Sequence, residues 1–152
     1  MIIRFVASTP FRTFLLYPLL LVAWELIVRH GELRVQPVFI PIVMWGYLQY
    51  RVVRDYRMKY GGGGYGFATA PDGLVVTGIF AYTRNPMYLG HIIFMIGVSL
   101  TLDSWLGALL TVVLMVWFHR RVLRDEVRLA EKFGAAYDDY KANVKRWVPG
   151  LF

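Results

Sequence analysis

Uncharged, mostly apolar residues occupy four blocks of the chain: residues 13–28, 35–50, 86–102 and 104–119. The first block contains one acid, Glu25, and the other three contain no Asp, Glu, Lys or Arg. A transmembrane helix needs about 20 apolar residues, with a lower limit of about 17. Each block reaches this length only if basic and aromatic side chains at its ends lie among the lipid headgroups. The pattern therefore predicts four membrane-spanning helices.

Short polar breaks pair these blocks into two helical hairpins. Between residues 86 and 118, Asp103 is the one Asp, Glu, Lys or Arg. A single helix over that run would be about 50 Å long at about 1.5 Å per residue, which exceeds one bilayer. We therefore expect the chain to reverse at residues 102–104, where a polar residue can cap the next helix. Residues 29–32, Arg-His-Gly-Glu, predict the turn of the first hairpin. Three prolines predict kinked or shifted helix ends in that hairpin: Pro18, Pro37 and Pro41.

The composition agrees with a membrane protein. Hydrophobic residues make up 57% and charged residues 18% of the 152 residues, and the mean hydropathy is +0.47. Soluble domains usually contain about 45–50% apolar and about 25% charged residues, so the composition excludes a disordered chain and disfavours a soluble globule. We expect a single all-α integral membrane domain over residues 1–152. Residues 1–24 also fit the apolar core of a signal peptide, although no small-residue cleavage site follows them.

The basic residues predict which side of the membrane each segment occupies. The chain carries 17 Lys and Arg against 10 Asp and Glu, a net charge of +7. Of the 17 basic residues, 15 precede the first block, lie in residues 51–85 or follow residue 119. By the positive-inside rule, the N-terminus, a loop over residues 51–85 and a tail over residues 120–152 are cytoplasmic. This predicts a multi-pass protein of the bacterial inner membrane or the endoplasmic reticulum, and it explains the charge without nucleic acid.

The predicted cytoplasmic tail is an amphipathic helical segment. At about 100° per residue, its apolar residues share one face: Val122, Leu129, Phe133, Tyr137, Tyr140, Val144 and Trp147. Gly134 interrupts the segment and predicts a break between two helices. Glu126 falls in the middle of the apolar face, where a carboxylate is costly unless it is paired. Two interpretations stay open: a salt bridge with Arg84, Arg121 or Arg146, and a polar contact to a ligand.

Glu25 in the first block is a further candidate, since acids within membrane spans are functional by default. Because it lies only a few residues from the end of its block, we expect it instead to reach outward to the headgroups. Asp125, Asp138 and Asp139 are expected on a solvated face. Because the chain has no Cys and its three His are scattered, we predict no disulfide and no metal site.

The start of the third block predicts an anion site. Asn is a favoured N-cap and Pro is favoured at the first helical position, so Asn85-Pro86 is expected to begin a helix. The free amides and positive dipole end of that helix favour an anion, and Arg84 adds a full positive charge. Gly90 allows a ligand to approach closely, and His91 beside it lines the same groove or caps an interface. The alternative is a helix cap, an Arg that reaches the headgroups and a glycine for helix packing.

Two motifs stand out in the second half of the chain. Residues 84–90 read Arg-Asn-Pro-Met-Tyr-Leu-Gly and follow the stretches 71–75, Pro-Asp-Gly-Leu-Val, and 78–80, Gly-Ile-Phe. The second motif lies in the tail and consists of Asp125-Glu126, Leu129, Phe133-Gly134, Tyr137, Tyr140, Val144, Arg146 and Val148-Pro149. In order and spacing they resemble R-[HN]-P-x-Y-x-G and E-E-x-x-L-x-x-x-F-G-x-x-Y-x-x-Y of the isoprenylcysteine carboxyl methyltransferase family. That family shares its pattern with the phospholipid N-methyltransferases, and the resemblance covers residues 70–150. Asn85 stands where His is commoner, and Asp125 stands where the family has Glu.

The resemblance implies a membrane methyltransferase that uses S-adenosylmethionine. In that family the cofactor lies at the cytoplasmic interface between the two motifs, and the lipid tail of the substrate enters from the bilayer. The resemblance assigns cofactor binding to residues around both motifs: Tyr82, Arg84, Asn85, Pro86, Tyr88, Gly90, His91, Glu126 and Tyr137. Arg84 would bind the cofactor carboxylate and Glu126 its ribose hydroxyls or amino group, while the tyrosines would face the adenine or the positive sulfonium.

The implied reaction is in-line displacement at the methyl group, with Glu126 and Arg146 as candidate catalytic residues. The main contribution of the protein would be to position two substrates. Arg146 would orient a carboxylate acceptor, or Glu126 would take the proton of an amine acceptor. The expected acceptor is a lipophilic small molecule, either isoprenoid or phospholipid-like. Two other functions stay open: NADPH-dependent reduction of a lipid double bond, since sterol reductases have a similar C-terminal architecture, and a non-enzymatic role in membrane assembly.

Overall fold

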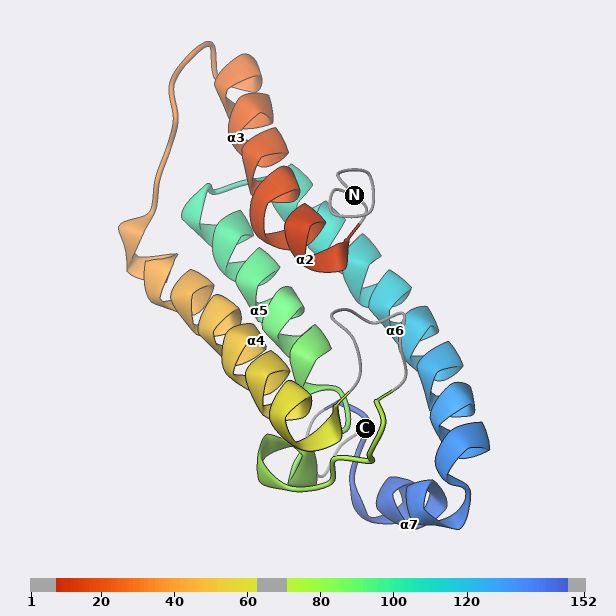
Figure 1. The fold of residues 1–152 in the computed structure, drawn as a ribbon. Helices are drawn as coiled ribbons and strands as arrows, with labels where there is room; N and C mark the ends of the chain where they lie inside the picture. The colour runs from red at the N-terminus through yellow and green to blue at the C-terminus, as the bar shows by residue number, and fades with distance from the viewer. Residues whose placement is uncertain (1–7, 63–70, 148–152) are drawn as a thin grey trace. The chain divides into compact units, whose positions relative to one another are not determined.

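The computed structural model describes residues 8–62 and 71–147, and in this part of the chain the regular structure is entirely helical (Figure 1). The helices, in chain order, are α2 (Thr9–Phe11), α3 (Tyr17–Val28), α4 (Ile40–Gly61), α5 (Pro86–Thr101), α6 (Trp105–Phe133) and α7 (Ala135–Asn143). A π-helical turn, Arg12–Leu16, joins α2 to α3, and short 3-10 turns occur at Pro37–Phe39 and Gly78–Ala81. The predicted all-α class is confirmed for these residues.

The chain divides into two units. Unit 1 comprises Met1–Leu48 and Gly90–Met115, and unit 2 comprises Gln49–Leu89 and Val116–Phe152. Each of the helices α4, α5 and α6 contributes residues to both units. Unit 1 contains most of the apolar helical surface, and unit 2 contains both sequence motifs apart from Gly90.

Two helical stretches of the described residues are long and apolar enough to cross a membrane, Thr9–Val28 and Trp105–Phe133. The apolar helix α5 is shorter. Large apolar side chains on the two long stretches are exposed, including Ile27 at 73% and Trp105 at 65% of the full side-chain area. This exposure is unusual on a surface that faces water and is normal where lipid is the solvent. The arrangement of four spans stays a prediction.

Two helices extend beyond the blocks predicted from the sequence. Helix α4 begins at Ile40 and continues to Gly61, so the predicted loop over residues 51–85 starts as a helix. No Gly or Pro interrupts α4 between Gly46 and Gly61, which explains why the helix persists after the apolar residues end. Helix α6 passes through residue 119 without a break, so the predicted span and tail share one helix. That helix ends before Gly134, whose φ of +52° confirms the predicted break.

Both predicted hairpin turns lie in unit 1. The chain leaves α3 through His30 and Gly31, which have φ values of +53° and +93°. Between α5 and α6 it turns at Asp103, with φ of +49°. The Oγ of Ser104 then accepts a hydrogen bond from the backbone N–H of Gly107 at 3.0 Å, which caps α6. The turns predicted at residues 29–32 and 102–104 are therefore confirmed.

Glu25 does not reach outward to the headgroups, contrary to the prediction. Its side chain is buried, and its Oε2 lies 2.8 Å from Nε of Arg29, one helical turn later. Nη2 of the same Arg29 donates to the backbone carbonyl of Asp103 at 2.6 Å. Pairing inside the fold offsets the cost of burying the carboxylate, and it ties the two hairpin turns together.

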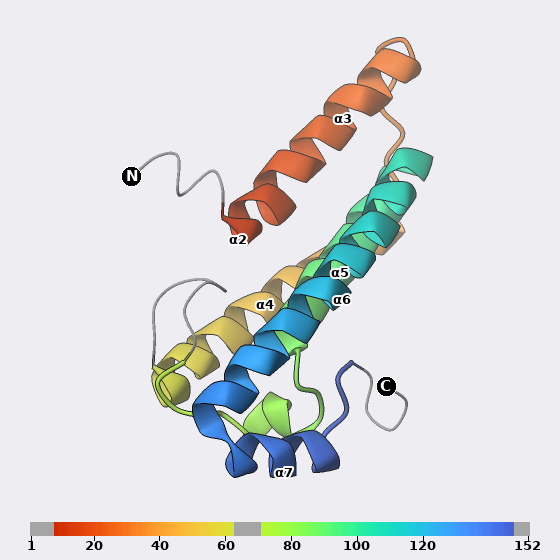
Figure 2. The same cartoon turned by 90° about the vertical axis from the view of Figure 1, so that its right-hand side faces the viewer.

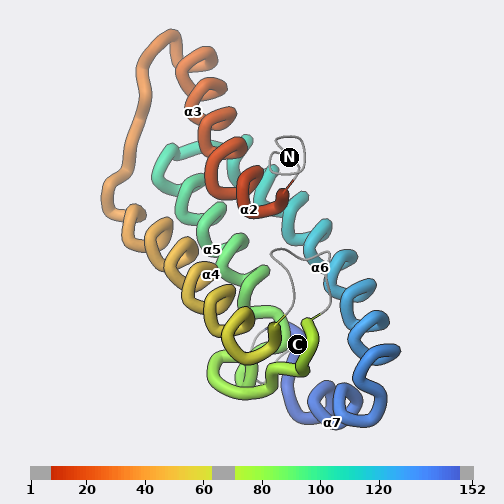
Figure 3. Tube along the Cα trace, in the orientation of Figure 1, coloured from red at the N-terminus to blue at the C-terminus, as the bar shows by residue number. Residues whose placement is uncertain are grey.

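Helices α4 and α5 lie side by side in unit 1, separated only by glycines (Figures 2 and 3). A Cβ added at Gly46 would lie 2.3 Å from the backbone N of Phe94 and 2.8 Å from the carbonyl oxygen of Gly90. A Cβ at Gly97 would lie 2.6 Å from the backbone N of Val43. Gly46 and Gly97 are thus the glycines at which α4 and α5 approach closely, and the Gly90 carbonyl lies opposite Gly46. Beside Gly90, the fully buried ring of His91 stacks on Phe14 with ring centroids 4.6 Å apart.

Substitution of Gly46 by Ala is expected to destabilise the protein by about 1–3 kcal/mol, because the new methyl group overlaps the backbone of α5. The measurement is the thermal midpoint of the purified protein in detergent. Gly73→Ala is the matched control, since a Cβ there meets nothing closer than 3.7 Å. Equal midpoints for the two variants would contradict the close packing of α4 on α5.

Candidate functional site

The start of α5 in unit 2 is fixed by the chain segment that follows α7. The backbone N–H of Leu89 donates to the carbonyl oxygen of Asn85, so Asn85 occupies the predicted N-cap position before Pro86. The side-chain amide of Asn85 and the hydroxyl of Thr83 both donate to the carbonyl oxygen of Arg146, each at 3.2 Å. The backbone N–H of Arg84 donates to the carbonyl oxygen of Lys145 at 3.0 Å. Residues 144–147, which we name the C-terminal strap, therefore lie against residues 83–85.

A buried ion cluster joins the strap to α6. Glu126 of α6 receives two hydrogen bonds from Arg146, Nε to Oε1 at 2.9 Å and Nη2 to Oε2 at 2.8 Å. Nη2 of Arg84 lies 3.4 Å from the same Oε1. The side chains of Glu126 and Arg84 are only 9% and 8% exposed. The predicted salt bridge of Glu126 is thus confirmed for Arg84 and Arg146, whereas Arg121 pairs with Asp125 at 3.5 Å.

Arg84 retains hydrogen-bonding capacity inside this cluster. Its Nε and Nη1 are buried, and within residues 8–62 and 71–147 neither has a hydrogen-bond partner. A buried donor without a partner costs free energy, and more so when it is charged. One nitrogen of this guanidinium contacts Glu126, and the other two have no hydrogen-bond partner among the described residues. The group can therefore bind a second anion, such as a carboxylate.

Two tyrosines of α7 close the other side of the cluster. Tyr137 is 1% exposed, and burial together with the charge of Glu126 raises its pKa to about 12, against the opposing effect of Arg84 and Arg146. Tyr140 donates its hydroxyl to the carbonyl oxygen of Phe80 at 2.6 Å, and burial raises its pKa as well. The hydrogen bond to Glu126 raises the pKa of Arg146. At neutral pH the site therefore contains neutral phenols and charged guanidinium groups.

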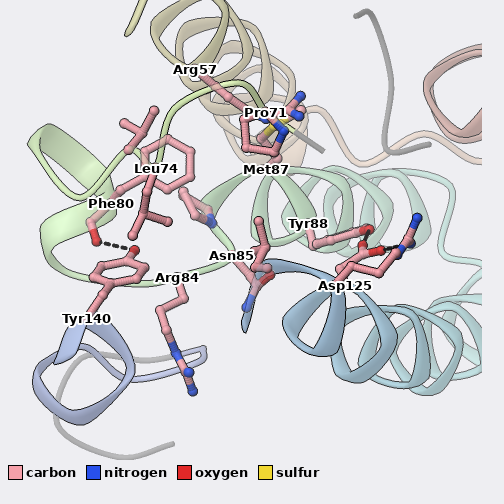
Figure 4. Close-up of a pocket in the computed structure, with 14 residues that line it drawn as sticks. Arg57, Pro71, Leu74, Phe80, Arg84, Asn85, Met87, Tyr88, Asp125 and Tyr140 are labelled. Carbon is pink, nitrogen blue, oxygen red and sulfur yellow. Dashed lines mark hydrogen bonds and ion pairs between the residues drawn. The ribbon is translucent and has the colours of Figure 1, made fainter. Parts of the chain in front are cut away.

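A cavity of about 120 Å³ opens beside these residues in unit 2 (Figure 4). Its apolar wall includes Leu74, Val75, Met87 and Leu129. Arg84 and Tyr140 lie at one end, and Tyr88 and Asp125 lie at the other, with Asn85 between them. The hydroxyl of Tyr88 donates to Oδ2 of Asp125 at 2.7 Å. The cavity thus combines an apolar surface with polar groups from both sequence motifs.

The structure brings together most of the residues predicted to bind a cofactor. Four of them line the cavity: Arg84, Asn85, Pro86 and Tyr88. Glu126 is connected to the cavity through its ion pair with Arg84, and the charges of both act on Tyr137. Tyr82 is 67% exposed and is not among the lining residues. Gly90 and His91 belong to unit 1.

Sequence reasoning missed several residues of the cavity, among them Asp125, Tyr140 and Arg57. The prediction that Asp125 lies on a solvated face is wrong, because Asp125 accepts a hydrogen bond from Tyr88 and lines the cavity. Its place in the second motif, directly before Glu126, was the signal. Tyr140 was recognised only as part of an apolar face, and Arg57 carried no signal apart from its charge.

Known proteins that resemble this chain are named as methyltransferases, but each resemblance covers only part of the relative's length. The sequence model of a family described as phospholipid methyltransferase matches residues 40–136, more than half of the chain. The protein-S-isoprenylcysteine O-methyltransferase of Schizosaccharomyces pombe is 35% identical over 77 residues, which cover 50% of this chain and 33% of the relative. The proteins of that name from Saccharomyces cerevisiae and Mus musculus are 36% and 31% identical over 77 residues, covering 50% of this chain and 32% and 27% of their own lengths. The match thus spans about a third of each relative.

Substitution of Glu126 by Ala is expected to destabilise the protein by about 3–5 kcal/mol, because it leaves the buried guanidinium of Arg84 without a counter-charge. Chemical denaturation in detergent measures the change. Glu131→Ala, at an exposed position on the same helix, is the matched control and should stay within about 0.5 kcal/mol of the unsubstituted protein. If the two variants were equally stable, the cluster would not support the fold.

Proposed function

The chain belongs to the phospholipid methyltransferase family, and on this basis we propose that it transfers a methyl group from S-adenosylmethionine to a lipophilic acceptor at a membrane interface. Membership confirms the resemblance that residues 84–90 and the tail motif indicated. The observation that carries the proposal is the guanidinium of Arg84, which is buried beside an apolar cavity and has two donors open for an anion.

The residues around the cavity fit the proposed cofactor. The carboxylate of its methionine portion is opposite in charge to Arg84, whose Nε and Nη1 are each available to donate to an anion. The backbone amides at the start of α5 strengthen that attraction through the positive end of the helix dipole. The aromatic ring of Tyr88, which lines the cavity, suits a sulfonium cation.

When bound, S-adenosylmethionine supplies a methyl group whose bond to sulfur breaks, the electron pair staying on sulfur, as a lone pair of the acceptor bonds to the methyl carbon. The side chains of this protein bind the two reactants and orient them toward each other. Arg84 holds an anion, Asn85 fixes the strap against the helix start, and the apolar wall excludes water from the cavity.

Glu126 and Arg146 hold each other in the structure, which constrains the roles proposed for them. Each oxygen of Glu126 already accepts one hydrogen bond from Arg146, and a carboxylate has room for about four. Glu126 therefore has capacity for an amino or hydroxyl group of the cofactor without losing its partner. Arg146 uses two of its five N–H donors on Glu126, so it too keeps donors with which to orient a carboxylate acceptor.

The acceptor proposed here is an isoprenoid or phospholipid-like molecule. The relatives named above are O-methyltransferases that act on protein S-isoprenylcysteine, and the family name refers to phospholipids. Both groups of acceptor carry a long apolar chain, which agrees with the exposed apolar helices of this protein. The carboxylate of an isoprenoid and the amine of a phospholipid are the two acceptor groups to be compared by experiment.

Substitution of Arg84 by Gln is expected to raise the dissociation constant of S-adenosylmethionine about tenfold to a hundredfold, because one charge-assisted hydrogen bond to a carboxylate is lost. Isothermal titration calorimetry with the detergent-solubilised protein measures it. The matched control is Arg124→Gln on the exposed side of α6, which should bind like the unsubstituted protein.

The same preparation tests the activity with labelled methyl donor and two acceptors, an isoprenoid carboxylic acid and phosphatidylethanolamine in vesicles. We expect label in one lipid product with the unsubstituted protein and a strongly reduced rate with Arg84→Gln. Absence of both cofactor binding and labelled lipid would overturn the proposal. A heat signal with NADPH in place of S-adenosylmethionine would favour a reductase instead.

We further propose that the chain crosses the membrane four times with both ends in the cytoplasm. Because the sequence contains no Cys, single cysteines report on topology without background. Glu32→Cys and Lys141→Cys are both at exposed positions. A membrane-impermeant maleimide is expected to label Glu32→Cys in intact cells and Lys141→Cys only after permeabilisation. Labelling of both variants from the same side would contradict the topology.

A further inference from the structure

Asp125 connects directly to the ring that lines the end of the cavity opposite Arg84. Its Oδ2 accepts the hydroxyl of Tyr88 at 2.7 Å, a bond between residues 37 positions apart in the sequence. Tyr88 is 4% exposed, and its ring packs at a tilt against Phe118 with centroids 5.0 Å apart. The ring is therefore fixed at two places, through its hydroxyl and through its contact with Phe118.

Two arginines of the same helix hold the Asp125 carboxylate. Nε of Arg121 lies 3.5 Å from Oδ1, and Nη2 of Arg128 donates to the same Oδ1. Both arginines lie at Oδ1, which leaves Oδ2 to accept the hydrogen bond from Tyr88. Tyr88 is the donor of the bond to Oδ2, so the direction of its hydroxyl is set.

This arrangement explains how the ring of Tyr88 lines the cavity. A tyrosine side chain rotates about two bonds, and its packing against Phe118 alone leaves the tilt of the ring adjustable. The hydrogen bond to Asp125 removes that freedom. The side of the ring not covered by Phe118 can then form a fixed wall of the cavity, where an aromatic face attracts a cation.

We propose that Asp125 is a positioning residue of the methyl-transfer site, which acts by anchoring Tyr88 so that its ring faces the positive centre of the bound methyl donor. The inference rests on the proposed function and deepens it. Asp125 exchanges no proton with the reactants, and Tyr88 keeps its proton throughout. Tyr88→Phe removes the donor of the anchoring bond. Asp125→Asn should have the same consequence, because its one remaining oxygen stays with the two arginines and its NH2 group then faces Tyr88.

The test compares two ligands that differ in charge at the position of the sulfonium. Sinefungin carries a protonated amine there, and S-adenosylhomocysteine carries a neutral sulfur. Asp125→Asn is expected to weaken sinefungin about tenfold and S-adenosylhomocysteine less than about twofold in calorimetry, the difference expected for a lost cation–aromatic contact. The KM for S-adenosylmethionine, whose sulfonium is also positive, should rise about tenfold, and kcat should change less.

Variants separate positioning from charge and from folding. Tyr88→Phe should match Asp125→Asn although it keeps the carboxylate, and the double variant should lose no more than either single one. Asp125→Glu, which restores the residue type of the family motif, should recover most of the sinefungin affinity. Asp139→Asn, an exposed acid on α7, is the matched control and should bind both ligands normally.

The outcomes also separate this inference from the proposed function. If neither ligand binds the unsubstituted protein, the proposed function fails. If both bind it and Asp125→Asn weakens them equally, or leaves both unchanged, the positioning role is overturned and the methyltransferase proposal stands. Losses that add in the double variant would likewise overturn the role of Asp125, because independent effects do not pass through one hydrogen bond.

Discussion

The carboxylate of Glu126 is the constraint on which unit 2 depends. Taking this charge out of water costs several kcal/mol unless partners surround it, and its partners come from two other segments of the chain, Arg84 before α5 and Arg146 in the C-terminal strap. Hydrogen bonds from the Arg84 backbone and from the Thr83 and Asn85 side chains to backbone carbonyls of the strap keep both arginines within reach. The helix start and the strap are therefore ordered together, and neither has its observed conformation without the other.

The continuity of α6 then determines where the polar ends of the cavity lie. Adjacent residues on an α-helix point about 100° apart, so Asp125 and Glu126 face different neighbours although they follow each other in the chain. Glu126 meets the arginines of the helix start and strap, and Asp125 meets Tyr88 at the opposite end of the cavity. A break in α6 at residue 119, the predicted end of the fourth span, would have separated these residues from the apolar part of the helix. One uninterrupted helix instead connects the apolar stretch to both acids.

Local signals in the sequence predicted the local features of this structure. The helix start at Asn85-Pro86, the turn at Asp103 and the break at Gly134 all follow from capping and turn preferences, and all are present. The ion pair of Glu126 was also predictable, because a carboxylate on an apolar face must have a partner. The pairing of Asp125 with Tyr88 was not, since helical periodicity gives the face of a residue but not the side chain that another segment presents to it. Helix α4 beyond residue 50 was missed because hydropathy marks where lipid ends and not where a helix ends.

Arg84 and Glu126, which form an ion pair, differ in how readily each can bind a group of a ligand. Arg84 has two open donors, so an anion can bind it without disturbing any contact of the protein. Glu126 is already bonded by both nitrogens of a bidentate guanidinium, and a ligand cation there competes with Arg146 unless it uses the remaining lone pairs. An anionic group at Arg84 therefore needs no rearrangement of the protein, whereas a cation at Glu126 needs one unless it binds the remaining lone pairs. The cavity of unit 2 thus places an anion site beside an apolar wall, which suits a ligand that carries both a charged and an apolar part.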